Sequence, residues 1–168
     1  MTNLEIERKY VIEKPQIDKM RECGAYTSSD IVQIYLDSEP GVTRRVRSRA
    51  YPGGRVQYFE TEKRKVDEMS AEEREREITK AEFDNFSLQI AQDTRPIIKT
   101  RHTFDYLGQT FEIDVYPEWE RTCIMETELP SRDTEVKMPD FIRIIAEVTG
   151  DKRYSNAAMS RSFPEELK

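Results

Sequence analysis

Charged side chains alternate with a period of two in five separate segments of this 168-residue chain. The segments are Glu5-Ile6-Glu7-Arg8-Lys9, Arg45-Val46-Arg47, Lys99-Thr100-Arg101, Glu112-Ile113-Asp114 and Glu126-Thr127-Glu128. Alternate side chains of a β-strand point to the same face of a sheet. Each segment therefore predicts a strand with one charged face, and such a face packs poorly into an apolar core.

The later four segments each carry a pair of charges of one sign, so that two pairs are basic and two are acidic. A sheet that closes into a barrel places acidic strands opposite basic strands around a charged lumen. Such a lumen suits metal ions that bridge to a polyanion. An open antiparallel sheet with a solvated charged face is the alternative, and the spacing of the charges alone leaves it open.

Alternation and turn residues predict eight strands, which are enough to close a barrel. Their expected ranges are about 3–13, 31–37, 42–49, 55–65, 73–79, 97–106, 110–117 and 122–129. Three helices are expected at about 15–23, 80–92 and 139–148. Pro15 precedes the first, Thr79-Lys80-Ala81-Glu82 has capping-box spacing at the second, and Pro139 and Gly150 delimit the third.

An E-x-E-x-K strand, formed by Glu5, Glu7 and Lys9, is followed by further charged motifs along nearly the whole chain. In order these are Arg45-Val46-Arg47, Thr61-Glu62-Lys63, Glu75-Arg76-Glu77, Lys99-Thr100-Arg101, Phe111-Glu112-Ile113-Asp114, Glu126-Thr127-Glu128 and Asp151-Lys152-Arg153-Tyr154-Ser155-Asn156. The ordered set resembles the CYTH, or triphosphate tunnel metalloenzyme, superfamily. The resemblance implies one domain over residues 1–168, mainly β with flanking helices (α+β), in which a closed eight-stranded antiparallel β-barrel forms a charged tunnel.

One segment gives conflicting local signals. Ser70-Ala71-Glu72-Glu73 has the spacing of a capping box, and helix propensity favours one helix from Ala71 to about Ala91. The period-two alternation over 73–79 instead indicates a strand, as the family pattern does. We therefore expect a strand here. The family often has an arginine two residues before Glu75, where this chain has Glu73, so one phosphate contact is expected to be missing.

The resemblance implies one or two divalent cations, Mg²⁺ or Mn²⁺, that bridge to the substrate. Such hard cations prefer carboxylate oxygens. The carboxylates at matching positions are Glu5, Glu7, Asp114, Glu126 and Glu128. The spacing of these residues alone shows only that they share strand faces.

The resemblance also assigns basic residues to the phosphate chain of the substrate. They are Lys9, Arg45, Arg47, Lys63, Lys99, Arg101 and Lys152. The planar fork of an arginine donates two hydrogen bonds to one phosphate, whereas a lysine acts as a mobile point charge. An ordinary surface lysine is an equal alternative for Lys152.

Two residues are candidates for catalysis. In similar proteins the lysine of E-x-E-x-K and a tyrosine on the second strand are proposed to activate or orient the attacking water. The matching residues are Lys9 and Tyr35. A strand aromatic that only packs its ring is the alternative for Tyr35.

Composition excludes several other chemistries. The net charge of −6 disfavours a nucleic-acid partner. A single histidine, His102, disfavours a histidine zinc site or a Ser-His-Asp triad, and neither a Walker loop nor a G-x-G-x-x-G turn is present. Two cysteines are too few for a disulfide scaffold, and no secretory signal or membrane-spanning run is visible. We expect a cytoplasmic protein with free thiols and no membrane partner.

The leading hypothesis is a metal-dependent triphosphatase that acts on inorganic tripolyphosphate and also on nucleoside triphosphates. It rests on the short chain and on the resemblance of its first strand to the compact bacterial triphosphatases. A class IV adenylyl cyclase, a thiamine triphosphatase and a non-catalytic polyphosphate-binding module are the alternatives. A small-molecule triphosphate is the expected partner, and the resemblance also admits a homodimer.

Overall fold

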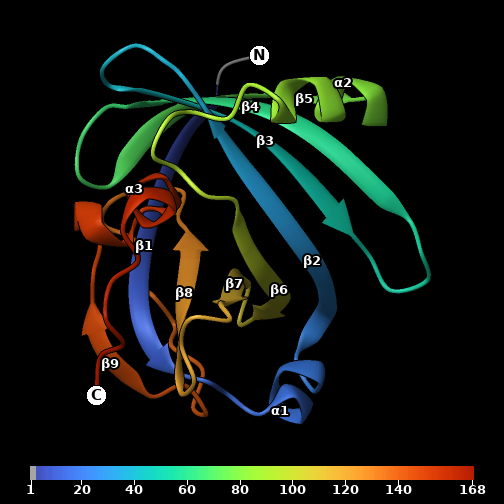
Figure 1. Ribbon diagram of the computed structural model, residues 1–168. Coiled ribbons are helices and arrows are strands. Elements are labelled where there is room, and N and C mark those ends of the chain that lie inside the picture. Colours follow the sequence, from blue (N-terminus) through green and yellow to red (C-terminus); the bar gives the residue numbers. More distant parts are fainter. Residues whose placement is uncertain (1–2) are drawn as a thin grey trace.

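The computed structural model describes residues 3–168 (Figure 1). Its strands, in chain order, are β1 (Asn3–Glu13), β2 (Gly24–Leu36), β3 (Val42–Ala50), β4 (Val56–Lys65), β5 (Ser70–Ile78), β6 (Ile97–Tyr106), β7 (Gln109–Val115), β8 (Thr122–Glu128) and β9 (Ile144–Glu147). Its helices are α1 (Ile17–Arg21), α2 (Lys80–Ser87), α3 (Asn156–Arg161) and the 3-10 turn η1 (Lys152–Tyr154). No helix in this part of the chain has the length and apolar character that crossing a membrane requires.

The strands form one antiparallel sheet in the order β5-β4-β3-β2-β6-β7-β8-β1-β9. The first half of β1 also pairs with β5, from Asn3 opposite Glu73 to Ile6 opposite Ser70. This pairing closes eight strands into a ring, because β5 is the first strand of the order and β1 is the eighth. The prediction of a closed, eight-stranded antiparallel sheet with few helices is confirmed.

The inward face of the ring is charged at one end and apolar at the other. Lys9 and Glu126 face inward on β1 and β8, and two residues further along the same strands Val11 and Ile124 are buried. These apolar residues belong to a cluster that the C-terminal segment completes. The cluster consists of Val11, Tyr35, Ile97, Tyr116, Trp119, Ile124, Val148, Tyr154 and Met159. It fills the ring beside α3, so the charged space occupies the remaining part of the lumen.

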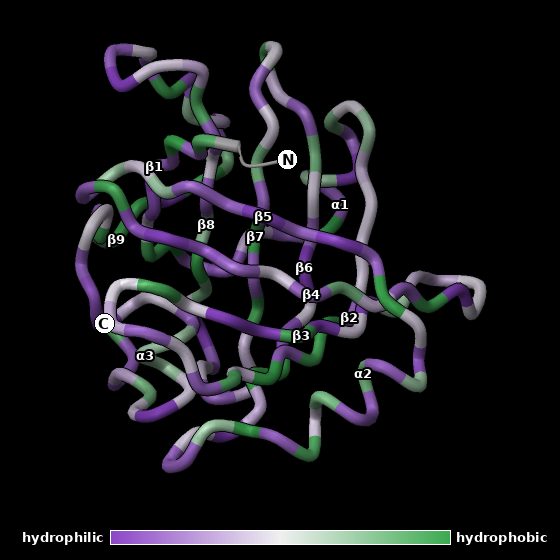
Figure 2. Tube along the Cα trace, turned by 90° about the horizontal axis from the view of Figure 1, so that it is seen from above, coloured by the Kyte–Doolittle hydropathy of each residue, from purple (hydrophilic) through white to green (hydrophobic). Residues whose placement is uncertain are grey.

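Two further apolar clusters cover the outside of the ring. One lies on the outer faces of β1, β6, β7 and β8, with Phe104, Phe111 and Met125 among its members, and α1 contributes Met20 to it. The other joins β2, β3 and β5 to α2, whose Phe83 packs against it. Figure 2 shows β5 as hydrophilic along most of its length. Because these two clusters pack against the outer faces of the strands, the strands hold the inward side chains in place.

The segment with conflicting signals is a strand, as expected. No helix begins at Ser70, despite its capping-box spacing, because β5 pairs with β4 on one edge and with β1 on the other. The capping box at Thr79 is present: its side chain accepts a hydrogen bond from the backbone N–H of Glu82, and α2 begins there. That helix ends at Ser87, earlier than expected, and β2 begins at Gly24, earlier than expected.

The helix expected at 139–148 is wrong. The segment contains β9, which pairs with β1 at Tyr10 to Ile12. In this half of β1 the edge is not covered by β5, so its backbone groups need another partner, and β9 supplies it. The apolar residues that suggested one helical face are divided: Phe141 packs on the outer cluster, and Val148 lies in the inner one.

Candidate active site

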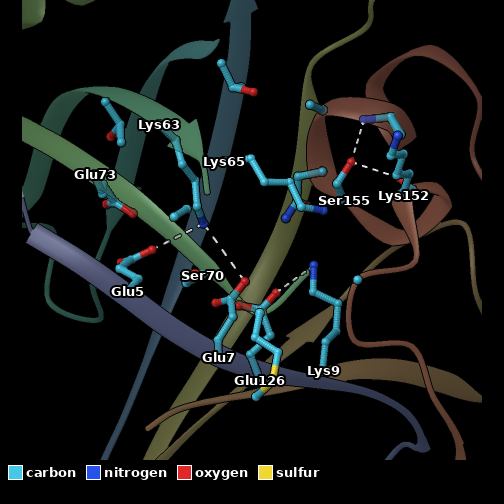
Figure 3. Close-up of a pocket in the computed structure, with 18 of the residues that line it drawn as sticks. Glu5, Glu7, Lys9, Lys63, Lys65, Ser70, Glu73, Glu126, Lys152 and Ser155 are labelled. Carbon is cyan, nitrogen blue, oxygen red and sulfur yellow. Dashed lines mark hydrogen bonds and ion pairs between the residues drawn. The ribbon is translucent and has the colours of Figure 1, made fainter. Parts of the chain in front are cut away.

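A cavity of about 560 Å³ lies inside the charged part of the ring (Figure 3). All eight strands of the ring, β1 to β8, contribute inward-facing side chains to its walls. The turn between β4 and β5 and the segment from Val148 to Ala158 border it as well, and Gly150 lies close to Glu68 of that turn. Residues far apart in sequence therefore line one cavity.

Three carboxylates from two adjacent strands face this space. Glu5 and Glu7 come from β1, and Glu126 comes from β8 (Figure 3). The ammonium of Lys63 on β4 lies 3.2 Å from Glu5 Oε2 and 3.9 Å from Glu7 Oε1. These pairs join β1 to β4, the two strands that flank β5, so the carboxylates are held on the inner face of the ring.

The electrostatic environment separates two of these carboxylates. Repulsion by Glu126, together with burial, raises the pKa of Glu7 to about 7. Burial also raises the pKa of Glu126, but Lys9 and Arg101 outweigh this and hold it at about 2. Glu126 is thus a fixed negative charge, whereas Glu7 carries its charge at a cost that a nearby cation would remove.

Lys9 is fixed beside Glu126. Its Nζ lies 3.2 Å from Glu126 Oε1 and donates to the backbone carbonyl of Tyr154 at 3.1 Å. Its backbone N–H donates to Thr149 Oγ1 at 3.0 Å. The C-terminal segment therefore positions this lysine as well as closing the apolar end of the ring.

Strand β3 presents arginines of a different kind. Arg47 is 8% exposed, and its Nε donates to Gln33 Oε1 at 2.8 Å. Arg45 has a buried Nε without a hydrogen-bond partner in residues 3–168. Neither guanidinium forms an ion pair with a described carboxylate, although both line the cavity. Burial, followed by Arg45 and Arg101, lowers the pKa of Arg47 to about 9.

Strand β6 presents cations that are fully paired. Arg101 Nε lies 2.8 Å from Asp114 Oδ1, and its NH1 lies 2.8 Å from Glu112 Oε2. Lys99 Nζ lies 2.8 Å from Asp114 Oδ2, and its side chain is 0% exposed. Burial raises the pKa of Asp114, but Arg101 and Lys99 outweigh burial and hold it well below its usual value.

The sequence matches no protein-family model and no curated protein. Among solved structures, the chain is similar to the inorganic triphosphatase NE1496, with 28% sequence identity over 96% of this chain and 97% of that chain and a TM-score of 0.61. The chain has the fold of the CYTH superfamily. PH1819 from Pyrococcus horikoshii OT3 shares this fold at 21% identity over 77% and 80% of the two chains, with a TM-score of 0.60.

A more distant CYTH-type likeness is HpAC1 from Hippeastrum, a candidate adenylyl cyclase with a dominant triphosphatase activity. Its sequence identity is 13% over 75% of this chain and 80% of that chain, with a TM-score of 0.51. At this identity the likeness concerns the fold alone. Chemistry must therefore be argued from the residues of this chain.

Most of the residues assigned through the CYTH resemblance line the one cavity. They are Glu5, Glu7, Lys9, Tyr35, Arg45, Arg47, Lys63, Arg101, Glu126 and Lys152. Three do not line it: Lys99, Asp114 and Glu128. Lys99 forms a buried ion pair with Asp114, so its position does not support the expected contact with substrate. Glu128 lies at the end of β8, opposite Glu7 in the strand register, and remains a predicted ligand.

The cavity also contains residues that were not among the candidates. They are Thr43, Arg49, Thr61, Lys65, Glu73, Glu75, Glu112, Thr149, Asp151 and Ser155, among others. Arg49 and Lys65 continue the same period-two series as Arg47 and Lys63, so the alternation itself was the signal that could have found them. Glu73 faces inward in the expected register, opposite Lys63. Burial is the main cause of the raised pKa of Glu5, and Glu73 raises it further.

Proposed function

We propose that the protein is a metal-dependent triphosphatase that hydrolyses an inorganic polyphosphate, with tripolyphosphate as its best substrate. The observation that carries the proposal is the pair of arginines on β3. Arg45 and Arg47 are largely buried cations that face the cavity without a carboxylate partner in the described chain. Burying an unpaired charge is costly, so such a site gains stability when an anion enters it. A triphosphate offers that anion.

The donor set fits a hard divalent cation, Mg²⁺ or Mn²⁺. Glu5, Glu7 and Glu126 would hold it, since their oxygens are the ligands such ions prefer. In residues 3–168 no three potential ligands converge as a preassembled centre, and Lys63 and Lys9 hold the carboxylates instead. The mutual repulsion that raises the pKa of Glu7 is the feature that a bound cation would relieve. When bound, the ion supplies positive charge to the phosphoryl oxygens.

The side chains of this protein would bind and orient the phosphate chain. Arg45 and Arg47 donate to it from one wall, and Lys63 donates from the next strand. Lys9 stands beside the carboxylates, where it holds the reacting end through its ammonium. Since phosphoryl transfer depends mainly on positioning and charge stabilisation, rigid donors on strands suit it.

The lining favours an inorganic substrate over one with an organic ring. Tyr35 is the single aromatic side chain among the described residues that line the cavity, and it is only 5% exposed. A purine or thiamine ring therefore has no exposed aromatic face to stack on. Nucleoside and thiamine triphosphates are therefore expected to bind through their phosphates alone. Tripolyphosphate consists only of such charged groups, so we expect it to bind better.

The test is a phosphate-release panel on the purified protein. Tripolyphosphate, ATP, thiamine triphosphate and pyrophosphate are each supplied with Mg²⁺, Mn²⁺ or a chelator, and cyclic AMP is measured in the ATP samples. Glu7→Gln removes an inward carboxylate, and Glu13→Gln removes an exposed one from the same strand. We expect metal-dependent release from tripolyphosphate that Glu7→Gln abolishes and Glu13→Gln leaves intact. Cyclic AMP as the main product would establish the cyclase instead.

Binding without turnover would establish the non-catalytic module. In that outcome, calorimetry detects tripolyphosphate binding, while none of the substrates releases phosphate with either metal. Equal activity of Glu7→Gln and the wild type would contradict the assignment of the inward carboxylates.

A further inference from the structure

Gln33 lies under the wall of the cavity and does not line it. The residue is 0% exposed, on β2, where its register partner on β3 is Arg47. Two residues further along β2, Tyr35 lies opposite Arg45 in the same register. The buried amide is therefore placed between a guanidinium and a phenol that both reach the cavity.

The hydrogen bonds of this group have only one consistent direction. A guanidinium can only donate, so the amide end that faces Arg47 must be the oxygen. Both Nε and NH2 of Arg47 donate to Gln33 Oε1, the former at 2.8 Å. The amide nitrogen is then turned to Tyr35, where Gln33 Nε2 donates to the phenol oxygen at 2.8 Å. An amide nitrogen has no lone pair to accept with, so the phenol must be the acceptor.

This direction decides what Tyr35 offers to the cavity. Its oxygen is engaged by Gln33, and its own O–H proton is left to donate elsewhere. Arg45, on the adjacent strand, is also a donor and cannot accept that proton. The proton is free to point toward the cavity that Tyr35 lines, where a phosphate oxygen is an acceptor.

We infer that Gln33 is a positioning residue that orients Arg47 and fixes the hydroxyl of Tyr35 as a hydrogen-bond donor to the polyphosphate. The inference rests on the proposed function for its substrate. It gives Tyr35 a role opposite to that of a water-activating base, since its hydroxyl donates a hydrogen bond to a phosphoryl oxygen and accepts no proton from water. No bond of the protein is made or broken, because the phenol acts through a hydrogen bond.

Gln33→Glu tests the direction of the chain. The glutamate has nearly the same shape and still accepts from Arg47, but its second oxygen can only accept, so Tyr35 must turn its proton toward it. We expect the variant to fold and to lose about 100- to 1000-fold in kcat on tripolyphosphate, the loss that removal of one transition-state donor brings. Gln92→Glu adds the same charge at an exposed loop position and is expected to keep wild-type kinetics.

A double-mutant cycle with Tyr35→Phe separates positioning from charge. If Gln33 acts through Tyr35, Gln33→Glu lowers kcat strongly in the wild-type background and by no more than about two-fold in the Tyr35→Phe background. An effect that is equal in the two backgrounds, or that appears in KM alone, would show that the glutamate only neutralises Arg47, and would overturn the inference. Unchanged kcat in Gln33→Glu would overturn it as well.

Failure of the proposed function is visible before any variant is made. A wild-type protein that releases no phosphate from any triphosphate refutes the hydrolase. In that case the same cycle is run on the dissociation constant of tripolyphosphate, measured by calorimetry in the presence of a chelator. Non-additive weakening by Gln33→Glu and Tyr35→Phe supports the inference, and additive weakening overturns it.

Discussion

Strands β3 and β6 carry the same alternation of basic side chains, but the partners of their cations differ. On β6, Lys99 and Arg101 share Asp114, with donor–acceptor distances of 2.8 Å. On β3, Arg45 and Arg47 have no ion pair within the described residues, and Arg47 donates to the neutral amide of Gln33. One strand is neutralised internally, and the other retains its charge for a ligand.

The neighbouring strand decides the difference. β6 pairs with β7, whose register places Asp114 opposite Arg101. β3 lies between β2 and β4, which place Gln33 opposite Arg47 and Thr61 opposite Arg45. A basic alternation therefore indicates an inward charged face, but the residues opposite it determine whether that face stabilises the fold or binds an anion.

The largest expected effect is on stability, from Asp114→Asn. Removing one partner of a buried ion-pair group leaves uncompensated charge and costs about 3–5 kcal/mol of unfolding free energy. Chemical denaturation of the metal-free protein at pH 7 measures the loss. Glu112→Gln, which removes the more exposed carboxylate from Arg101, should cost about 1 kcal/mol or less. Equal losses in the two variants would contradict the neutralised-strand interpretation of β6.

The same variant has a defined pH dependence. Because the folded-state pKa of Asp114 is depressed, its stabilisation is complete above the unfolded-state pKa of about 3.9 and is lost as the pH falls below that value. The gap in unfolding free energy between the wild type and Asp114→Asn should narrow as the pH falls below about 4, where the carboxyl of Asp114 becomes protonated. A gap that does not narrow below about pH 4 would show that Asp114 is not stabilised as a carboxylate.

Arg47→Met should remove function while leaving the fold intact. We expect kcat/KM for tripolyphosphate to fall by about 100- to 1000-fold, since a donor aimed at the reacting phosphate is lost. Arg44→Met is the matched control, because Arg44 lies on the same strand, faces outward and pairs with Glu60 at 3.6 Å. Steady-state phosphate release compares them, and similar losses in both variants would break the contrast between the two faces of β3.

Ligand binding should stabilise the protein through β3. Tripolyphosphate at about 100 times its dissociation constant should raise the unfolding free energy by about 2.7 kcal/mol. Thermal unfolding in a chelating buffer detects this as a higher midpoint for the wild type and for Asp114→Asn, with little change for Arg47→Met. Full stabilisation of Arg47→Met would place the anion elsewhere.

The smallest effect is the stability of ligand-free Arg47→Met. Burial lowers the pKa of Arg47 to about 9, which shows that the fold carries this charge at a cost. Replacing it with an apolar side chain of similar length removes this cost but leaves the buried Gln33 Oε1 without a donor, so the unfolding free energy should change by no more than about 1–2 kcal/mol. A loss as large as that of Asp114→Asn would mean that Arg47 is structural.

The sequence was sufficient for the eight strands of the ring and for ten of the residues that line the cavity. Charge alternation placed Glu5, Glu7 and Lys9 on one face, and the ordered motifs implied the ring that brings them to Lys63. It was insufficient where partners are set by register, because Lys99 and Arg47 look alike until β7 and β2 are placed beside them. Gln33 carries no charge and lies outside every motif, so only the strand pairing revealed it.

The third predicted helix failed for a related reason. The spacing of Phe141, Ile145 and Val148 fits one face of a helix, but the open edge of β1 required a strand partner. Local periodicity contains no information about an unpaired edge elsewhere in the chain. The same limit explains why the C-terminal contacts of Lys9 with Tyr154 and Thr149 were not foreseen.

The most direct measurement is a calorimetric titration of tripolyphosphate into the wild type, Arg45→Met and Arg44→Met, without divalent metal. The two arginines are adjacent on β3; Arg45 faces the cavity and Arg44 faces away from it. The account predicts that Arg45→Met weakens binding by about 10- to 100-fold, the value of a charge-assisted hydrogen bond, while Arg44→Met binds like the wild type. Equal affinity of Arg45→Met and Arg44→Met would contradict the claim that the unpaired cations of β3 are the anion site.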